Sequence, residues 1–559
     1  MSDRGDVGRM LSSAAGAAAA FPTLDRAQLE LLDALGTRRS VEVGEYLYRQ
    51  GDASYDFYAV VSGAVDIVLQ ADGEERFITR HGPGRFLGEL NMLTGLRVFV
   101  SARVVEAGEV IVVPVAGLRR VLATQPQLGD TILAAFMARR EVLLSGASAA
   151  IRVVGSRFSP ESQQVREFLA RSRIPHEWLD PDRDDSVDRL LREVGVTPAE
   201  LPVVIVSGAV LRRPTPGALA EYLGITVGNL PDRCFDLVVV GGGPAGLAAA
   251  VYGASEGLRT LGVDMVAPGG QAGSSSRIDN YLGFPTGISG SDLTQRALVQ
   301  AEKFGAHLTA PCAAESLREQ AGHLVVRLTD GTDVAGRAVI VASGARYRRL
   351  DVDRLADFER KGVYYAATAT EARECAHSPV VVVGGGNSAG QAAMFLAESS
   401  SPVTVVIRRP DLTASMSRYL VDRIEADPRI DVRPGTRIID LDGDETLRAV
   451  RVAGPDGDAT LACVALFSFI GAEPASEWLS GCAALDERGF VLTGLSLAEE
   501  HLDRRWELLG RRPLPFETSH PGLFAVGDVR AGSTKRVAAA VGEGSAAVRS
   551  VHDYLAFAR

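Results

Sequence analysis

Hydrophobic and polar positions divide the chain into three stretches of different periodicity. From about Phe21 to Leu144, short β-branched runs such as YAVVSGAVDIVLQ alternate with glycine turns, which predicts an antiparallel all-β domain closed by a helical segment. A smaller β-α pattern follows, with the strand-like run IRVVGSRF before the helical run QQVREFLARSR, and ends near Ile225. From Cys234 onward, continuous apolar runs alternate with helical runs, which is typical of parallel α/β sheets.

The composition narrows the class of protein. At roughly 150 residues per domain, the 559 residues predict three or four domains. Hydrophobic residues make up 46 % of the chain, which is enough for each domain to bury a core. The net charge of −11 argues against a nucleic-acid partner, which would require a basic face. No run approaches the ~18 apolar residues of a membrane span, so we expect no membrane partner.

The cysteines and the first residues bear on the compartment. Five widely spaced cysteines without a CxxC pair predict neither a secreted disulfide framework nor a metal site, and a reduced, cytoplasmic protein is expected. The start, MSDRGDVGRMLSSAAGAAAAFPTL, has two arginines and a small-residue run but lacks the leucine-rich centre of a signal peptide. We expect residues 1–20 to form a disordered tail.

The first candidate site follows the apolar run Phe235–Val240. Gly241, Gly243 and Gly246 form G-x-G-x-x-G, which allows a tight turn, close approach of the backbone to a pyrophosphate, and close helix–strand packing. The helix that follows would present free amides to the phosphates. Asp264, 23 residues after Gly241, can accept hydrogen bonds from ribose hydroxyls. Although a lone glycine motif is weak evidence, this strand–turn–helix context predicts a site for FAD or NAD.

The pattern recurs in VVVVGGGNSAGQAAMFLA, where Gly384, Gly386 and Ala389 occupy the same frame. At the position equivalent to Asp264, this second motif has no acid and instead offers Arg408 and Arg409. Guanidinium groups bind a ribose 2′-phosphate, whereas an acid would repel it. The second site is therefore interpreted as selective for NADPH. The alternative is that two surface arginines simply end a strand.

Further motifs occur in a fixed order over about residues 232–559. They are GGQ (Gly269–Gln271), IDNYLGFP (Ile278–Pro285), ASGA (Ala342–Ala345), FSFIGAEP (Phe467–Pro474), GLFAVGDVR, and KRVAAAVGEG (Lys535–Gly544). With both glycine motifs, they make this part resemble the low-molecular-weight thioredoxin reductases. The resemblance implies an α/β fold of two Rossmann-like (GR2-type) domains and a homodimer. FAD would be held by residues 232–350 and 478–559, and NADPH by the inserted residues 351–477.

The resemblance also implies which residues contact each cofactor. The FAD set is Gly241, Gly243, Ala245, Gly246, Asp264, Gly270, Gln271, Asn280, Gly344, Gly527, Asp528, Lys535, Arg536 and Val537, with Asp528 hydrogen-bonded to the ribityl chain. The NADPH set is Gly384, Gly386, Asn387, Ser388, Ala389, Arg408, Arg409, Ile470 and Gly471. Lys535-Arg536 replaces the Arg-Gln of the family, and a positive group near flavin N1 would stabilise the anionic reduced flavin.

The stretch YYAATATEA departs from the family at its chemical centre. The family motif reads CATCD, in which the two cysteines carry electrons and the acid donates a proton. The same frame here reads Ala366, Ala367, Thr368, Ala369 and Thr370. A methyl group can form neither a thiolate nor a disulfide, so no catalytic residue is predicted in this motif. Nearby Cys375 could act as a lone thiol, although a structural role is favoured.

Residues 150–228 resemble a thioredoxin- or glutaredoxin-like domain that has also lost its cysteines. The CPxC motif of such domains is replaced by Ser159, Pro160, Glu161 and Ser162. Pro202 stands where that fold keeps a cis-proline before a strand. Because a serine hydroxyl has far too high a pKa for thiol exchange, this domain is not expected to reduce disulfides.

Residues 21–148 resemble a β-roll cyclic-nucleotide-binding domain. The run RFLGELNMLTG resembles its phosphate-binding cassette, in which Gly88 and Glu89 would contact the cyclic phosphate and a ribose hydroxyl. The arginine that neutralises the phosphate in this family is replaced by Val100, and Arg97 lies three residues earlier. Either Arg97 reaches into the pocket, or the pocket no longer binds a cyclic nucleotide.

Three functions fit these observations. The leading hypothesis is an NADPH-dependent FAD oxidoreductase that passes electrons to an acceptor other than a protein CxxC, such as a quinone, a ferredoxin-like protein, a small disulfide or oxygen. The second is a regulatory flavoprotein that signals NADPH or nucleotide state to a partner through its N-terminal domains. The third, a disulfide reductase working through Cys375, is the least favoured.

Overall fold

The structure, a computed structural model, describes most of the chain. It covers residues 19–71, 74–145, 151–157, 159–184, 186–206, 209–226, 233–275, 277–359, 361–367, 369–399, 402–444 and 446–557. The tail expected at residues 1–20 lies outside this range except for its last two residues. Ala20 is buried, so packed chain begins just before the expected boundary at Phe21.

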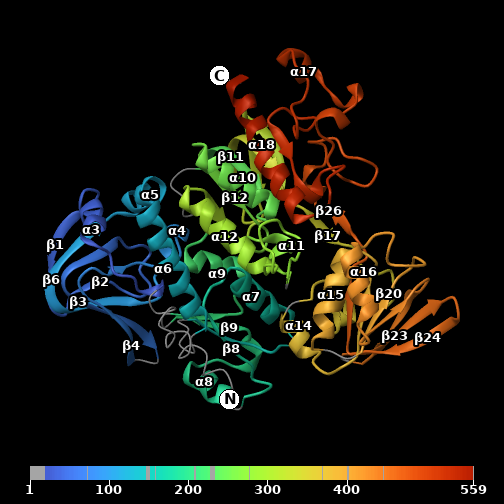
Figure 1. Cartoon of the computed structure of the whole chain (residues 1–559), viewed down its shortest axis with the longest axis horizontal. Helices are drawn as coiled ribbons and strands as arrows, with labels where there is room; N and C mark the ends of the chain where they lie inside the picture. Colours follow the sequence, from blue (N-terminus) through green and yellow to red (C-terminus); the bar gives the residue numbers. More distant parts are fainter. Residues whose placement is uncertain are drawn as a thin grey trace.

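The first domain is an antiparallel β-roll, seen in blue in Figure 1. Its strands are β1 (Thr37–Val41), β2 (Tyr46–Tyr48), β3 (Phe57–Ala71), β4 (Glu74–His81), β5 (Phe86–Leu87) and β6 (Ser101–Val113), paired in the order β1-β6-β3-β4 with β2 on β6 and β5 on β3. Its helices are α3 (Arg26–Asp33), α4 (Asn91–Thr94), α5 (Val115–Thr124) and α6 (Pro126–Ser145). The rings of Phe57, Phe86 and Phe136 pack together in its core.

The second domain has a four-stranded mixed sheet in the order β10-β9-β7-β8. The strands are β7 (Ile151–Val154), β8 (Glu177–Leu179), β9 (Val203–Val206) and β10 (Ala209–Arg212), and the helices are α7 (Pro160–Arg171), α8 (Ser186–Glu193) and α9 (Pro216–Leu223). Ser159 caps α7 by accepting a hydrogen bond from the Ser162 N–H (3.2 Å), and Pro160 suits the first helical position. The expected cis bond at Leu201–Pro202 is confirmed.

The third domain is built from two separate chain segments. Parallel strands β11 (Cys234–Val240), β12 (Thr260–Val263), β13 (His307–Thr309), β16 (Asp333–Val341) and β27 (Leu523–Ala525) share a sheet with the antiparallel strands β14 (Ala314–Gln320) and β15 (His323–Leu328). Its helices are α10 (Pro244–Ser255), α11 (Gly270–Gly273), α12 (Gly290–Lys303), α17 (Arg504–Leu509) and α18 (Val537–Phe557). Since β27 pairs with β16, the segments on both sides of the expected insertion form one sheet.

The fourth domain is the insertion, seen at the lower right of Figure 1. A five-stranded parallel sheet has the order β18-β25-β19-β20-β21, and a three-stranded sheet β22-β23-β24 lies beside it. The strands are β18 (Val363–Tyr364), β19 (Val380–Val383), β20 (Val403–Val406), β21 (Ile430–Arg433), β22 (Arg437–Gly443), β23 (Leu447–Gly454), β24 (Gly457–Ala462) and β25 (Ala465–Ser468), and the helices are α13 (Leu355–Phe358), α14 (Ala369–Glu374), α15 (Asn387–Ala397) and α16 (Arg418–Ala426). The pair β17 (Ala345–Tyr347) and β26 (Ala472–Pro474) forms the two-stranded connection to the third domain.

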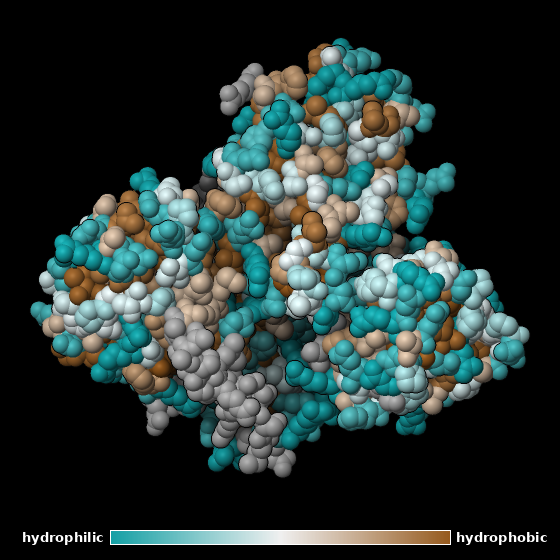
Figure 2. Space-filling view, in the orientation of Figure 1, coloured by the Kyte–Doolittle hydropathy of each residue, from teal (hydrophilic) through white to brown (hydrophobic). Residues whose placement is uncertain are grey.

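The N-terminal domains pack against the rest of the molecule. Val299 of α12 belongs to the apolar cluster of the β-roll, and Leu96 and Phe99 of the β-roll belong to that of the second domain. The surface in Figure 2 is mainly hydrophilic, with small scattered hydrophobic areas. Among the described helices, none has the length and apolarity needed to cross a membrane. The described residues also contain no group of three metal-ligating side chains.

Candidate functional site: two dinucleotide folds and an altered redox motif

The first glycine motif forms a tight turn between β11 and α10. Gly241 has a φ of +110°, and a Cβ there would lie 2.2 Å from the carbonyl oxygen of Ala342. A Cβ on Gly246 would lie 1.8 Å from the carbonyl oxygen of Gly241. Gly243 begins the helix without a side-chain cap, so the first N–H groups of α10 remain available to an anion. This turn fits the pyrophosphate of a dinucleotide.

Asp264 fixes the shape of this turn. Its carboxylate accepts hydrogen bonds from the N–H groups of Gly242 (2.7 Å), Val266 (2.9 Å) and Ala267 (2.9 Å). Since a carboxylate offers about four acceptor positions, one remains for a ribose hydroxyl. A role in holding the loop was not foreseen from the sequence, and the ribose contact stays a prediction.

The GGQ segment lies between Gly243 and the start of β17. Gly269 and Gly270 both have positive φ angles, and a Cβ on Gly270 would lie 2.7 Å from the Cα of Gly243. The side-chain amide of Gln271 donates to the carbonyl oxygen of Ala345. Gly344 has a φ of +70°, with no atom within 4 Å of its Cβ position. These glycine segments border the space in which the flavin is predicted to lie.

Asp528 and Lys535 meet at one side of this space. The Lys535 ammonium donates to the carbonyl oxygen of Asp528 (2.5 Å) and lies 4.5 Å from the centre of the Phe490 ring. Burial raises the pKa of the Asp528 carboxyl, an effect that the Lys535 charge opposes. Burial likewise lowers the pKa of Lys535, which Asp528 and Glu543 oppose. The predicted cation, which is exposed like Arg536, is therefore next to the predicted ribityl ligand.

An ion pair behind Asp528 was not predicted from the sequence. Glu543 of α18 accepts the N–H of Gly527 (2.7 Å) and binds both Nε (3.0 Å) and Nη2 (2.7 Å) of Arg530. The signal was the isolated acid within the small-residue run VAAAVGEG. This pair fixes the turn that presents Asp528.

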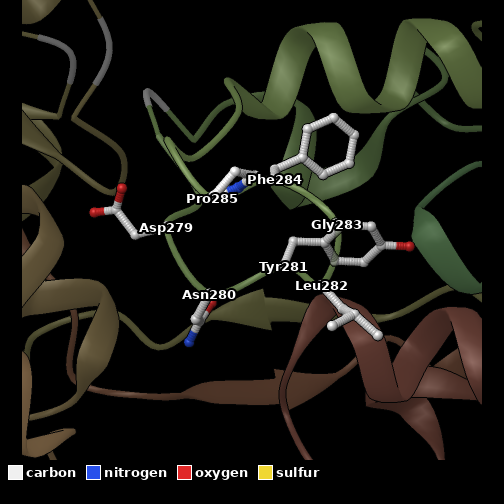
Figure 3. Close-up of a pocket in the computed structure, with 7 residues that line it drawn as sticks. All are labelled: Asp279, Asn280, Tyr281, Leu282, Gly283, Phe284 and Pro285. Carbon is white, nitrogen blue, oxygen red and sulfur yellow. The ribbon is translucent and has the colours of Figure 1, made fainter.

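Asn280 lies on the loop Asp279–Pro285, which lines a hollow of ≈ 510 Å³ (Figure 3). Tyr281, Leu282 and Phe284 project from the loop in different directions, and Leu282 is 92 % exposed. Asp279 points away from them and lies 3.7 Å from Arg423 of α16 in the inserted domain. The loop therefore contacts both domains.

The altered redox motif faces the third domain. Tyr365, just before Ala366, stacks on Tyr347 of β17 with ring centres 6.0 Å apart and planes 12° apart. Ala366 is partly buried, Ala369 begins α14, and Thr368 lies outside the described residues. Tyr347 is close enough for the charge of Asp528 to influence its pKa. The segment 366–370, which contains no cysteine, is therefore joined through the Tyr365–Tyr347 stack to the neighbourhood of Asp528.

Cys375 cannot replace the missing thiols in this arrangement. Its side chain is 3 % exposed. Burial, together with the charges of Glu374 and Glu371, raises the pKa of its thiol to about 12. A protonated, buried thiol is neither a nucleophile nor accessible to a substrate. The structural role favoured from the sequence fits this environment.

The second glycine motif repeats the first between β19 and α15. Gly384 has a φ of +136°, and its Cβ would lie 2.3 Å from the carbonyl oxygen of Phe469. Gly386 begins α15 without a side-chain cap and with open space at its Cβ position. The side-chain oxygen of Asn387 accepts the N–H of Ser417 (2.7 Å), which ties the helix start to the next loop. Gly471, with a φ of +106°, also borders open space.

Arg408 and Arg409 follow β20 and are both exposed. Neither forms an ion pair with another side chain in the described part of the chain. The nearby carboxylate of Asp411 accepts both the N–H (2.8 Å) and the hydroxyl (2.6 Å) of Thr413. These hydrogen bonds lower the pKa of Asp411, and the Arg409 charge adds to the effect. The two guanidinium groups are accordingly available to a phosphate.

In the β-roll, Arg97 turns away from the nucleotide pocket. Its guanidinium donates to the carbonyl oxygens of Tyr222 (2.7 Å) and Gly51 (3.0 Å), so it joins the β-roll to the second domain. With these two contacts Arg97 does not line the pocket in this structure, so a contact of Arg97 with a cyclic phosphate stays a prediction. Sequence spacing gave no sign of this contact between domains.

The pocket itself is small in this structure. The cavity measures ≈ 60 Å³, and its lining includes Gly88, Glu89, Phe21 and Arg139. Glu89, the predicted ribose ligand, is paired instead with Arg140 of α6, whose Nε and Nη2 lie 2.5 and 3.1 Å from its carboxylate. In this state, a cyclic nucleotide would meet a closed pocket with no phosphate-binding arginine at the expected position.

Comparisons with known proteins agree with this geometry. Residues 235–544 match the family model described as "Pyridine nucleotide-disulphide oxidoreductase", and residues 38–125 match "Cyclic nucleotide-binding domain". These matches confirm both principal resemblances drawn from the sequence.

Curated relatives and solved structures match the same C-terminal part. The thioredoxin reductase of Listeria innocua is 30 % identical over 328 residues, covering 58 % of this chain and 95 % of that protein. The NADPH-dependent thioredoxin reductase 3 of Arabidopsis thaliana is 32 % identical over 329 residues, covering 57 % and 58 %. The crystal structure of Lactococcus lactis thioredoxin reductase (FR conformation) is 25 % identical with a TM-score of 0.51, covering 58 % and 99 %.

Proposed function

The chain belongs to the pyridine nucleotide-disulphide oxidoreductase family, and from that premise we propose that it is an NADPH-dependent FAD oxidoreductase. Its electrons would leave the flavin for an acceptor outside the protein, without passing through a protein disulfide. One observation carries this proposal. The chain has two dinucleotide folds, and the residue at the redox position beside the predicted flavin site is an alanine, Ala366.

The proposal assigns each cofactor to a separate group of described residues. The turn at Gly241–Gly246 and the uncapped start of α10 would hold the pyrophosphate of FAD, and Asp528 would hold its ribityl chain. Arg408 and Arg409 would hold the 2′-phosphate of NADPH. When bound, the flavin supplies a two-electron acceptor for hydride. Lys535 would favour the reduced, anionic form through its positive charge.

The acceptor must differ from that of a disulfide reductase with an internal CxxC. A quinone, a ferredoxin-like protein, a small disulfide or oxygen can each accept electrons directly from a reduced flavin. The buried thiol of Cys375 does not support the route through that residue. We also propose a cytoplasmic homodimer, which rests on the family resemblance and on the widely spaced cysteines.

Anaerobic mixing of the purified protein with NADPH, and separately with NADH, tests this function. The account expects the flavin absorbance to bleach quickly with NADPH and much more slowly with NADH. A protein that retains FAD but is not bleached by either nucleotide would contradict the proposal.

A regulatory flavoprotein is the second candidate. It is supported by the direct packing of the β-roll on α12 of the FAD domain through Val299, and by Arg97, which joins the β-roll to the second domain. If the protein is regulatory, NADPH should bleach the flavin absorbance only slowly, and reduction of the flavin should change the binding of a partner. The same anaerobic experiment therefore separates the two functions by rate.

A further inference from the structure

The second domain reaches the flavin site through its first helix. Arg171, the last residue of α7, donates from Nη2 to the carbonyl oxygen of Gly270 (3.1 Å). Gly270 lies in the GGQ segment, which belongs to the predicted flavin contacts. In Figure 1, α7 accordingly lies beside α11, which begins at Gly270.

The charge of Arg171 acts on the same neighbourhood as that of Asp528. Both influence the pKa of Tyr347: burial raises it to about 12, the Arg171 charge lowers it, and the Asp528 charge raises it. The Arg171 side chain is 24 % exposed, and its Nη1 lies 3.4 Å from the more exposed carboxylate of Glu167, so solvent and this carboxylate offset its charge only in part. A cation from the second domain thus lies among the groups that surround the predicted flavin.

The end of α7 is held firmly enough to keep Arg171 in place. The carbonyl oxygen of Arg173 accepts from Nη1 of Arg140 (3.3 Å) in the β-roll. The guanidinium of Arg173 donates to the hydroxyl of Ser291 in α12 (3.3 Å) and binds Glu141 of α6. Three domains therefore meet within two residues of Arg171. Because these contacts already restrict the end of α7, less conformational entropy remains to be lost when Arg171 is ordered at the flavin site.

We propose that the thioredoxin-like domain completes the flavin site, with Arg171 as a positioning residue that fixes the Gly270 carbonyl and places a positive charge near the flavin. This inference rests on the proposed FAD site. It gives a role to a domain whose Ser159 and Ser162 cannot exchange disulfides. The start of α7 carries the altered motif, and its last residue is Arg171. The second domain would then support the flavin through the C-terminal end of this helix.

The physical effect has a definite sign. A positive charge near the flavin stabilises the reduced anion more than the neutral oxidised ring, so its removal should favour the oxidised form. Loss of the hydrogen bond should also loosen the GGQ segment and speed FAD release.

Three variants of the full-length protein test the proposal. Arg171→Met removes both the charge and the hydrogen-bond donor, whereas Arg171→Gln removes the charge and keeps an amide donor on a shorter side chain. Arg166→Met is the matched control, because Arg166 lies in the same helix with its guanidinium over the ring of Trp178 (5.3 Å). The measurements are FAD content, the FAD release rate and the flavin midpoint potential from dye-coupled titration.

We expect both Arg171 variants to shift the oxidised-to-reduced ratio about tenfold toward oxidised flavin, which is about 30 mV for a two-electron couple. Their FAD release should be severalfold faster, and Arg166→Met should match the wild type. The inference is overturned if the Arg171 variants match the wild type, or if Arg166→Met changes as much as they do. Failure of the FAD site itself is distinguishable, because the wild-type protein would then contain no FAD.

Discussion

Asp264 and Arg409 stand near equivalent ends of the second strand in the two dinucleotide folds. The carboxylate of Asp264 is turned inward and accepts three backbone N–H groups, whereas the guanidinium of Arg409 is exposed. The same topological position therefore organises a loop in one domain and carries an exposed guanidinium, the proposed phosphate ligand, in the other. At the residue scale, we expect such single side chains to decide which nucleotide each fold accepts.

The double substitution Arg408→Ala/Arg409→Ala should remove the preference for NADPH. Hydrogen bonds to charged groups contribute about 1.5–3 kcal/mol, so the NADPH concentration for half-maximal bleaching should rise roughly tenfold to a hundredfold. The value for NADH should stay unchanged.

Rapid-mixing measurements with both nucleotides check this prediction. Arg418→Ala is the control, because Arg418 is 75 % exposed and pairs with Asp422 within α16. The deciding quantity is the ratio of the NADPH and NADH concentrations that give half-maximal bleaching. If this ratio is the same in the double variant and in the wild type, these arginines are excluded as phosphate ligands.

At the scale of elements, the flavin site depends on the close approach of α10 and α18. A Cβ on Gly544 would lie 2.0 Å from the carbonyl oxygen of Ala245, directly after the start of α10. The helix N-terminus that would bind the pyrophosphate is thus placed by a contact with the last helix of the chain.

Gly544→Ala should separate these helices and weaken FAD retention. Adding a methyl group to a packed contact costs about 1–3 kcal/mol. The control, Gly542→Ala, adds a methyl where no atom lies within 4 Å. It should stabilise the same helix by about 0.5–1 kcal/mol.

Thermal unfolding and FAD content of the two variants provide the measurement. Opposite changes in the unfolding temperature are expected. Equal effects from the two substitutions would show that α10 and α18 are not in close contact at this point.

Local patterns predicted the elements of the dinucleotide folds because their signals are short in sequence. A strand, a glycine turn and a helix fall within about 20 residues at Gly241 and again at Gly384. The contacts of Arg97, Arg171 and Glu543 were not predicted, since each depends on segments brought together only by tertiary packing. A side chain that binds a distant backbone carbonyl leaves no periodic pattern in the sequence.

At the scale of the whole molecule, a buried acid lies where the β-roll meets the FAD domain. Glu302 of α12 is 4 % exposed, and burial raises the pKa of its carboxyl to about 8 although the charges of Arg140 and Arg119 lower it. Arg119 also lowers the pKa of the neighbouring His307, whose burial has the larger effect in the same direction. The interface therefore contains a carboxyl that is protonated near neutral pH.

Stability at this interface should fall as the pH rises. The folded protein holds the Glu302 proton up to about pH 8, whereas the unfolded chain releases it near pH ~4.3. The folded state therefore binds more protons between these values, and the loss of stability approaches about 1.4 kcal/mol per pH unit.

Unfolding temperatures of the wild type and Glu302→Gln between pH 6 and 9 measure this effect. The wild type should lose more stability than the variant over this range, because glutamine cannot ionise. Parallel pH profiles would contradict the assigned protonation of Glu302.

The most direct measurement of the central claim is an anaerobic titration of the FAD-loaded protein with NADPH, following flavin absorbance to its end point. Because only the flavin stores electrons in this account, one equivalent of NADPH per FAD should complete the bleaching without a long-wavelength thiolate–flavin band. A second equivalent consumed by the protein would reveal a redox-active disulfide and contradict the claim. Absence of bleaching would contradict the oxidoreductase function itself.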